Sequence, residues 1–595
     1  MGQYNAPLRD MHFVLHELLD AVPTLRAMPA HEEVDAETIN AILQEAARFS
    51  ADILAPINLS GDLEGCTHRD NGVVTTPSGF KEAYRQYVDA GWPALNCDPA
   101  YGGQDLPFLI KSVVSEMLCA ANQAWTAYPG LSYGAYECLH AHGSPAQRTI
   151  YVTKLTSGTW TGTMCLTEPH CGTDLGLIRT KAQPEEDNSY SITGTKIFIS
   201  GGEHDMAENI VHLVLARLPD APAGTKGISL FIVPKFIPDP AGNPGQRNGI
   251  VCGSIEHKMG IHGNSTCEMN LDGARGWLVG APNKGLNAMF VMMNTARLGV
   301  GIQCVGLADF SYRNSLAYAL DRHQMRGAAG PVAPDKPADP IIVHPDVRRM
   351  LLTQKAYVEA GRALTYWTAL EIDKENSHPD QTVRAAAADH IALLTPVIKA
   401  FISDNTFECT NHAMQIFGGH GYIHASGMEQ YVRDARLNSL YEGTNGVQAL
   451  DLLGRKVLAD GGARLKGFGK VVQNFLVQEA GNADMREFCA PLLDLAGKVI
   501  QLTEEIRAKA LKNPNEVGAA SPHYLRVLGH LTFAYLWAQM ARIALARKDS
   551  NDPFYSAKLA TARFYFTKIL PETTYQIAAI QAGSAPLMDM QADQF

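Results

Sequence analysis

A single acidic residue, Glu442, stands in the hexapeptide Tyr-Glu-Gly-Thr-Asn-Gly, which runs from Tyr441 to Gly446. Glycine and small hydroxylated neighbours leave room for a substrate carbon on one side of this carboxylate and for a flat ring system on the other. Burial of such a site would raise the pKa of the carboxyl toward values useful for taking up a proton at neutral pH. The hexapeptide therefore predicts a general base, with an exposed Glu in a Gly-rich loop as the alternative for these six residues taken alone.

Further blocks of small residues precede this hexapeptide. Leu-Thr-Glu-Pro spans Leu166 to Pro169 and is followed by Gly172-Thr173-Asp174, whereas Gly418 to Tyr422 and then Arg433-Asp434 come much later. Small and hydroxylated residues let backbone N–H groups approach phosphate oxygens. Together and in this order, over roughly residues 40–455, the blocks resemble the acyl-CoA dehydrogenase family.

The resemblance implies an FAD enzyme that removes two hydrogens from the α and β carbons of an acyl-CoA and leaves a trans-2-enoyl-CoA. In this family Glu442 would abstract the α proton and FAD N5 would accept the β hydride. The backbone N–H of Glu442 and a flavin ribityl hydroxyl would stabilise the charge on the thioester oxygen. Arg297 matches a family arginine near the active site and is assigned to CoA contact or to orientation of the base. An electron-transferring flavoprotein is the expected electron acceptor.

The same resemblance assigns one group of residues to the flavin. They are Met164, Leu166, Thr167, Gly172 and Thr173 around the ring and pyrophosphate, Phe198 and Ser200 beside the ring, and Thr444 as a further contact. Three residues of this group and its loop depart from the family pattern. Phe198 replaces the usual tryptophan and so lacks its N–H donor, and His170-Cys171 replaces smaller residues. Because these two adjacent residues have no ligand partners in the sequence, no metal site is predicted.

Another group of residues is expected to serve FAD across a subunit interface. Arg322 resembles the arginine that reaches the pyrophosphate of a neighbouring subunit, since a guanidinium makes bidentate contacts to phosphate oxygens. Met325 stands where an aromatic contact is common. Gln415 and Gly418-Gly419 match the segment that holds the adenosine end, although a plain helix-ending turn is the alternative for these glycines. We therefore expect a homo-oligomer, either a dimer or a tetramer.

Composition limits the other classes of function. The chain has 595 residues and a formal net charge of −11, which indicates several domains and no nucleic-acid or anionic-membrane surface. Its eleven cysteines are odd in number and include no Cys-x-x-Cys pair, which argues against a disulfide framework. The sequence does not open with a basic segment followed by an apolar one, so no signal peptide is expected. No apolar run approaches ~20 residues. A cytoplasmic protein without a membrane segment is therefore expected.

Hydrophobic periodicity predicts a mainly helical fold with an inserted β domain, as in the acyl-CoA dehydrogenases. The expected units are an N-terminal extension (1–35), an N-terminal helical domain (36–159), a middle β barrel or sandwich (160–282), a helical four-helix-bundle domain with the FAD and catalytic sites (283–456) and an additional C-terminal helical domain (457–595). Within them, helices are predicted near 36–60, 79–90, 107–122, 145–157, 285–321, 344–374 and 383–416, the last bent near Pro396. Thr193-Gly194 is predicted as a hairpin-like pair in the β domain.

The segments from Tyr4 to Met11 and from Leu450 to Lys456 resemble a long subgroup that includes bacterial 3-methylmercaptopropionyl-CoA dehydrogenases. A thioether sulfur occupies about the space of a methylene, so activity is expected on that thioester and on short- to medium-chain acyl-CoA, as in fatty acid β-oxidation. A long-chain acyl-CoA dehydrogenase and an acyl-CoA oxidase are the enzyme alternatives. A catalytically quiet DNA-binding flavoprotein of this fold is the alternative from another class. It would need a strongly basic tail, but from Lys456 onward 16 Lys and Arg stand against 13 Asp and Glu, a net charge of only +3.

Overall fold

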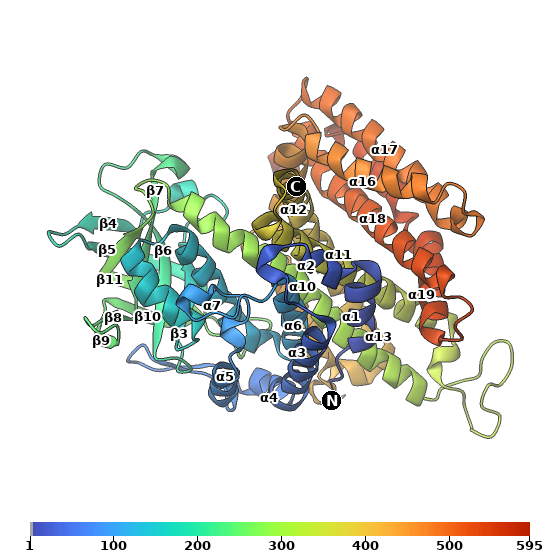
Figure 1. Ribbon diagram of the computed structural model, residues 1–595, viewed down its shortest axis with the longest axis horizontal. Helices are drawn as coiled ribbons and strands as arrows, with labels where there is room; N and C mark the ends of the chain where they lie inside the picture. Colours follow the sequence, from blue (N-terminus) through green and yellow to red (C-terminus); the bar gives the residue numbers. More distant parts are fainter. Residues whose placement is uncertain (1–3) are drawn as a thin grey trace.

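A computed structural model describes residues 4–595, so the first three residues of the predicted extension 1–35 lie outside it. Figure 1 shows a β-rich part at one side, a helical middle through which the long helix α10 passes, and a C-terminal helical part above it. All eleven cysteines are free thiols, most of them buried.

The N-terminal part is built from helices that supply one wall of the later site. They are α1 (Leu8–His12), η1 (Phe13–Leu18), α2 (Ala21–Arg26), α3 (Ala36–Phe49), η3 (Ser50–Leu54), α4 (Pro56–Glu64), α5 (Phe80–Asp89), α6 (Phe108–Ala121), α7 (Gln123–His142), α8 (Pro145–Gln147), η6 (Arg148–Val152) and α9 (Thr153–Thr156). The side chain of Asp35 caps α3 by accepting a hydrogen bond from the backbone N–H of Thr38 at 2.7 Å, which satisfies one of the free donors of the first turn.

Helix α7 is absent from the sequence-based prediction. Pro129 lies inside it and its buried residues surround most of its circumference, so neither helix-breaker rules nor a one-sided apolar stripe reveals it. Its start is fixed by Asn122, whose side chain accepts the backbone N–H of Trp125 at 3.0 Å. The neighbouring helix α6 begins where the buried carboxylate of Asp373 accepts the backbone N–H groups of Phe108 and Leu109 at 2.7 and 3.0 Å.

The middle part is a seven-stranded sheet with the order β10-β11-β5-β4-β6-β3, in which β7 also pairs with β11 and β6. Its strands are β3 (Trp160–Cys165), β4 (Lys181–Pro184), β5 (Tyr190–Ser200), β6 (Asn209–Arg217), β7 (Ile228–Pro234), β10 (Ile250–Ile255) and β11 (Thr266–Val279). The predicted hairpin at Thr193-Gly194 is wrong, because β5 continues through both residues. Glycine is required there by packing, since a Cβ on Gly194 would lie 2.4 Å from the hydroxyl of Thr180.

The helical middle contains α10 (Gly285–Asp321), α11 (Pro345–Ser377), α12 (Gln381–Val397), α13 (Ser403–Phe417), α14 (Met428–Leu437) and α15 (Asn445–Leu450). The bend predicted near Pro396 takes the form of a π-helical turn, η10 (Ile398–Ile402), between α12 and α13. Two stretches, Gly285–Asp321 and Gln381–Tyr422, are long and apolar enough to cross a membrane by length and composition, but half or more of each apolar window is buried inside the fold.

The C-terminal part comprises α16 (Ala463–Gln478), α17 (Arg486–Ala510), α18 (Asn515–Ala546), α19 (Pro553–Phe564), η15 (Tyr565–Ile569) and α20 (Glu572–Gln581). Figure 1 shows α16, α17 and α18 above α11, with α19 to the right of it. Helix α18 is buried along most of its length, and the indole N–H of Trp537 donates to the carbonyl of Ala356 in α11 at 3.2 Å. One hydrophobic core therefore continues from the N-terminal helices through α11 into the C-terminal part.

A buried ionic network crosses the same junction. Arg362 of α11 donates to Glu116 of α6, to Asp309 of α10 and to Asp10 of α1. Lys558 of α19 donates to Asp10 as well. The network thus joins the N-terminal extension, both helical parts and the C-terminal helices at one point, and none of its members was singled out from the sequence.

Candidate active site

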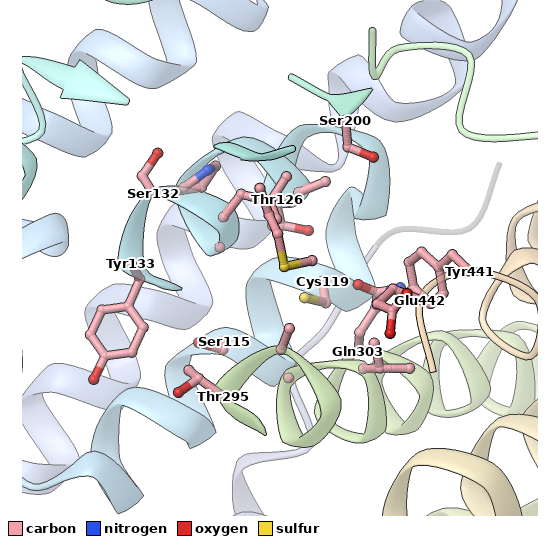
Figure 2. Close-up of a pocket in the computed structure, with 18 of the residues that line it drawn as sticks. Ser115, Cys119, Thr126, Ser132, Tyr133, Ser200, Thr295, Gln303, Tyr441 and Glu442 are labelled. Atoms are coloured by element: carbon pink, nitrogen blue, oxygen red, sulfur yellow. The ribbon is translucent and has the colours of Figure 1, made fainter. Parts of the chain in front are cut away.

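A cavity of about 760 Å³ lies where the sheet, the helix pair α6–α7, the first half of α10 and the loop before α15 meet. The predicted site residues that line it are Met164, Leu166, Thr167, Gly172, Thr173, Phe198, Ser200, Arg297, Glu442 and Thr444. Figure 2 shows Ser200 and Glu442 at different sides of this cavity, with Gln303 and Tyr441 beside Glu442. The structure therefore brings the predicted base and the predicted flavin contacts of one chain into a single space.

The predicted contacts across a subunit interface lie elsewhere. Arg322 and Met325 follow the C-terminal end of α10, whereas Gln415, Gly418 and Gly419 mark the end of α13. These two helix ends are neighbours, because Tyr318 stacks on Phe417 with ring centroids 4.2 Å apart. From Arg297 to Arg322 the continuous helix α10 rises about 37 Å at ~1.5 Å per residue. This group therefore does not contribute to the cavity of its own chain.

Glu442 is half-buried in the loop between α14 and α15. Burial raises its pKa above the usual value, and the nearby Arg297 guanidinium is the largest opposing influence. Gly443 follows with φ of +74°, and a Cβ there would lie 2.7 Å from Nε2 of Gln448 and 3.2 Å from Nε of Arg297. Glycine is thus required both by the left-handed backbone and by the close approach of Arg297.

The loop that carries Glu442 is held in place by contacts of Asn445 with residues in and next to the π-helical turn η10. The Asn445 side chain donates to the carbonyl of Ala400 at 3.2 Å and to the hydroxyl of Ser403 at 2.9 Å, and it accepts from Nζ of Lys399 at 2.9 Å. Burial lowers the pKa of Lys399 to about 8. The first residue of α15 is therefore held by side-chain contacts to a different helix, and this arrangement limits movement of Glu442.

The opposite wall is formed by the sheet and the loop after β3. Glu168 accepts Nζ of the fully buried Lys196 at 2.9 Å and the hydroxyl of Thr180 at 2.6 Å. Ile197 donates its backbone N–H to the carbonyl of Thr167 at 2.9 Å, so the loop is fastened to β5 beside Phe198. These contacts hold the backbone of the predicted flavin-contact loop in one conformation.

His170 and Cys171 do have an acidic neighbour, in contrast to the reading of the sequence. One possible ligand atom from each of Glu168, His170 and Cys171 lies within 4.8 Å of the others. However, the Glu168 carboxylate is already hydrogen-bonded to Lys196 and Thr180, and Nε2 of His170 lies 2.9 Å from the carbonyl oxygen of Leu177. The three residues therefore lie close together because of the way the loop folds, and Glu168 and His170 already have protein partners.

The floor of the cavity consists of residues that the sequence did not single out. From α6, α7 and α10 these are Lys111, Ser115, Cys119, Thr126, Gly130, Tyr133 and Gln303. The signal that could have revealed them is the recurrence of small or polar residues at a spacing of four, such as Ser115-Cys119 and Thr126-Gly130, on helices that are otherwise buried and apolar. The Thr126-Gly130 pair could not be placed because α7 is not predicted, whereas the Ser115-Cys119 pair lies on the predicted helix near 107–122 and was overlooked there.

Comparison with known proteins places this architecture in a family. Successive family models match residues 36–159 (acyl-CoA dehydrogenase, N-terminal domain), 163–274 (middle domain) and 283–458 (C-terminal domain). A fourth model, acetyl-CoA dehydrogenase C-terminal like, matches residues 468–591. The chain belongs to the acyl-CoA dehydrogenase family, with an added C-terminal helical domain.

Individual relatives share this whole length. The chain is 40% identical over 581 residues to 3-methylmercaptopropionyl-CoA dehydrogenase of Ruegeria pomeroyi, covering 97% of this chain and 98% of the relative. It is 34% identical to the broad-specificity linear acyl-CoA dehydrogenase FadE5 of Mycobacterium tuberculosis over the full length of both. In fold, it resembles ACDH-11 of Caenorhabditis elegans, solved with C11-CoA, at a TM-score of 0.77 and 18% identity, covering 100% of this chain and 97% of that one.

The cavity fits the FAD that acyl-CoA dehydrogenases use. Phe198 lines it with 59% of its surface exposed, and its φ of +59° is a strained conformation for an aromatic residue, of the kind that clusters at functional sites. The Nε of Arg297 is buried without a hydrogen-bond partner among residues 4–595. An exposed ring face and an unpaired donor at one cavity suit a flat ligand with polar substituents. The protein is thus an FAD-dependent oxidoreductase of the acyl-CoA dehydrogenase class.

Proposed function

We propose that Glu442 is the general base that removes the α proton of an acyl-CoA thioester. The observation that carries this role is the position of its half-buried carboxylate at the cavity shared with Phe198 and Thr167. Burial raises the pKa of Glu442 and the nearby Arg297 opposes that rise, and the Arg297 side chain packs on Gly443. FAD held against the sheet wall would supply the acceptor for the hydrogen and electrons that leave the β carbon. The backbone N–H of Glu442 is positioned in the same loop to stabilise the thioester oxygen.

Purified protein tests the cofactor and the reaction together. We expect a yellow protein with about one FAD per chain, because the predicted ring contacts line one cavity. Anaerobic addition of a suitable acyl-CoA should bleach the flavin absorption band. A colourless protein that cannot be reconstituted with FAD would contradict the proposal. Release of peroxide in air in proportion to enoyl-CoA formed would instead identify an acyl-CoA oxidase.

The substrates are proposed to be 3-methylmercaptopropionyl-CoA and straight-chain butanoyl- to octanoyl-CoA. The support is the similarity to a 3-methylmercaptopropionyl-CoA dehydrogenase and to a broad-specificity linear acyl-CoA dehydrogenase. An apolar pocket separates such near-isosteres by only ~1–3 kcal/mol per methylene, so overlapping activity is expected. A panel of acyl-CoA thioesters with an artificial electron acceptor measures kcat/KM for each. Activity confined to tetradecanoyl-CoA and longer chains would reject this range.

One observation favours the long-chain alternative. The cavity continues beyond Thr126 and Gly130 to Tyr84, Tyr87 and Trp92 in the interior of the N-terminal helices. A Cβ on Gly130 would meet open space, so no side chain closes the passage at this point. If that passage accommodates acyl chains, kcat/KM stays high beyond octanoyl-CoA.

Further parts of the proposal concern partners and location. We propose a homodimer, because the Arg322 and Gln415 group lies about 37 Å from Arg297 along the rise of α10 and can serve FAD only from another copy. Met325 in this group is 77% exposed. Light scattering that showed an active, flavin-loaded monomer would reject the dimer.

The free cysteines suit a cytoplasmic enzyme of fatty acid β-oxidation. An electron-transferring flavoprotein is the proposed acceptor, testable by acyl-CoA-dependent reduction of that protein.

A further inference from the structure

The side chain of Lys111 lines the active-site cavity at the end away from Glu442. Along α6, Cys119 lies at the end near Thr126, and Lys111 is eight residues away, which corresponds to a rise of about 12 Å at ~1.5 Å per residue. Both residues line the cavity, as does Tyr133. Figure 2 shows Tyr133 and Glu442 on opposite sides of the space, with Ser115, Cys119 and Thr126 between them.

The Lys111 side chain lies among aromatic rings. Its Nζ is 3.5 Å from the ring centroid of Tyr133 and 5.4 Å from that of Phe108. The Tyr133 hydroxyl cannot serve the ammonium as a strong acceptor, because it donates to Glu137 at 2.7 Å and accepts from Nδ2 of Asn96 at 2.7 Å. Within residues 4–595, the side-chain ammonium of Lys111 forms neither a hydrogen bond nor an ion pair.

An ammonium in such surroundings is poorly compensated. Burial lowers its pKa to about 8, and the nearest opposing charge, Glu137, raises it only in part. Lys111 is only partly exposed, and an ammonium that loses part of its hydration without a hydrogen-bonded protein partner is costly, because aromatic rings replace only a fraction of that hydration. A methyl-terminated acyl chain would leave this cost in place, whereas a carboxylate would offer charge-assisted hydrogen bonds.

We propose that Lys111 forms a subsite for the terminal carboxylate of ω-carboxyacyl-CoA thioesters. This inference rests on the proposed function, because the subsite is the distal end of the acyl pocket that begins at Glu442. Chains long enough to reach from Glu442 to Lys111 are the substrates concerned. Shorter chains end before the ammonium and do not contact it.

The test compares two substrate series in the flavin-loaded enzyme. One series runs from hexanedioyl- to tetradecanedioyl-CoA as mono-thioesters, and the other consists of the methyl-terminated thioesters of equal length. In the unchanged enzyme we expect at least one ω-carboxy substrate to match or exceed its methyl-terminated counterpart in kcat/KM. In Lys111→Met the ratio of the two should fall about 10- to 100-fold, as expected for loss of a hydrogen bond to a charged group. Lys111→Arg keeps the charge and should retain most of the ratio.

Lys154→Met is the matched control. Lys154 also lies in the N-terminal helical part over an aromatic ring, with Nζ 5.7 Å from the ring centroid of Trp160, but it is not part of the cavity lining. Its substitution should leave the ratio unchanged, and FAD content verifies that each variant is folded. Turnover of methyl-terminated but of no ω-carboxy substrate would overturn the subsite alone, as would an unchanged ratio in Lys111→Met. Turnover of no acyl-CoA at all would overturn the proposed function itself.

Discussion

Two arginines of this protein lie beside carboxylates in opposite ways. Arg362 is buried, and its Nε and Nη atoms donate to Glu116 at 2.9 Å, to Asp309 at 3.0 Å and to Asp10. Arg297 is buried at Nε without a partner among the residues described, and its Nη1 reaches Asn294 at 3.2 Å. The first guanidinium is saturated by the protein, whereas the second faces a cavity with donors still free.

This difference between Arg362 and Arg297 distinguishes charged groups that hold the fold together from charged groups that are available to a ligand. In the Arg362 network each of the three carboxylates accepts from Arg362, and Lys558 adds a second cation at Asp10, so the network holds the N-terminal extension, the core helices and α19 in one arrangement. Near Glu442 the charges are only partly compensated, and burial raises the pKa of the carboxyl. Unsatisfied groups cost stability, and they are retained where a ligand completes them.

The largest expected effect is on the catalytic side of this comparison. Glu442→Gln keeps the shape of the side chain and removes the proton acceptor, so kcat should fall by at least ~10²-fold. A carboxyl whose pKa is raised by folding costs stability at pH values above its unfolded pKa, so the thermal midpoint of the variant at neutral pH should be unchanged or higher. Stopped-flow flavin bleaching and a thermal scan measure both, and near-normal turnover would place the base elsewhere.

A change in the Arg362 network should instead lower the stability of the fold. Arg362→Met leaves Glu116, Asp309 and Asp10 with too few partners, which should lower the free energy of unfolding by about 3–5 kcal/mol. Urea titration followed by circular dichroism measures the loss. Arg563→Met is the matched control, because its pair with Glu487 is largely exposed and should contribute only ~0–1 kcal/mol. Equal losses in both variants would refute the distinction.

A smaller effect is expected at the anchor of the base. Asn445→Ala removes the contacts to Ala400, Ser403 and Lys399 without altering the cavity lining, and should lower kcat by roughly 10- to 100-fold through misplacement of Glu442. KM and FAD content should change little, since the residue touches neither ligand. Asn482→Ala is a suitable control because Asn482 is exposed and the hydrogen bond of its side chain goes to Glu479, far from the loop of Glu442. A change in KM with kcat preserved would argue against a positioning role.

The smallest effect concerns pH. In the proposed mechanism the ionised form of Glu442 is the active one, so kcat/KM should increase with pH through a pKa above the usual glutamate range. Arg297→Met removes a positive neighbour that favours the carboxylate, so the pKa should rise further and the acid limb should move to higher pH. A pH–rate profile of both proteins checks the direction. A shift toward lower pH would show that Arg297 does not act on Glu442 electrostatically.

Local residue patterns were enough to predict much of the fold. Helix α10 was expected at 285–321 and is observed there, because a long run of apolar and small residues without Pro has few alternatives. Glu442 and the loop from Leu166 to Thr173 were singled out because their motifs, taken together and in this order, resemble those of the acyl-CoA dehydrogenases. Their roles stay predictions until the variants are measured, but their meeting in one cavity is observed.

Non-local packing decided the rest. Helix α7 carries Pro129 and is buried on most sides, so its pattern resembles no surface helix, and β5 passes through Gly194 because Thr180 crowds that position. The Arg362 network joins residues up to 548 positions apart, and Lys111 acquires its surroundings only when α6 and α7 pack together. Sequence by itself determined the chemical groups and the local backbone that can carry them, since these depend on residue type and short-range sterics. Tertiary structure decided which groups became paired, which stayed unsatisfied and how far the cavity extends. The distances that set these energies exist only in the folded chain.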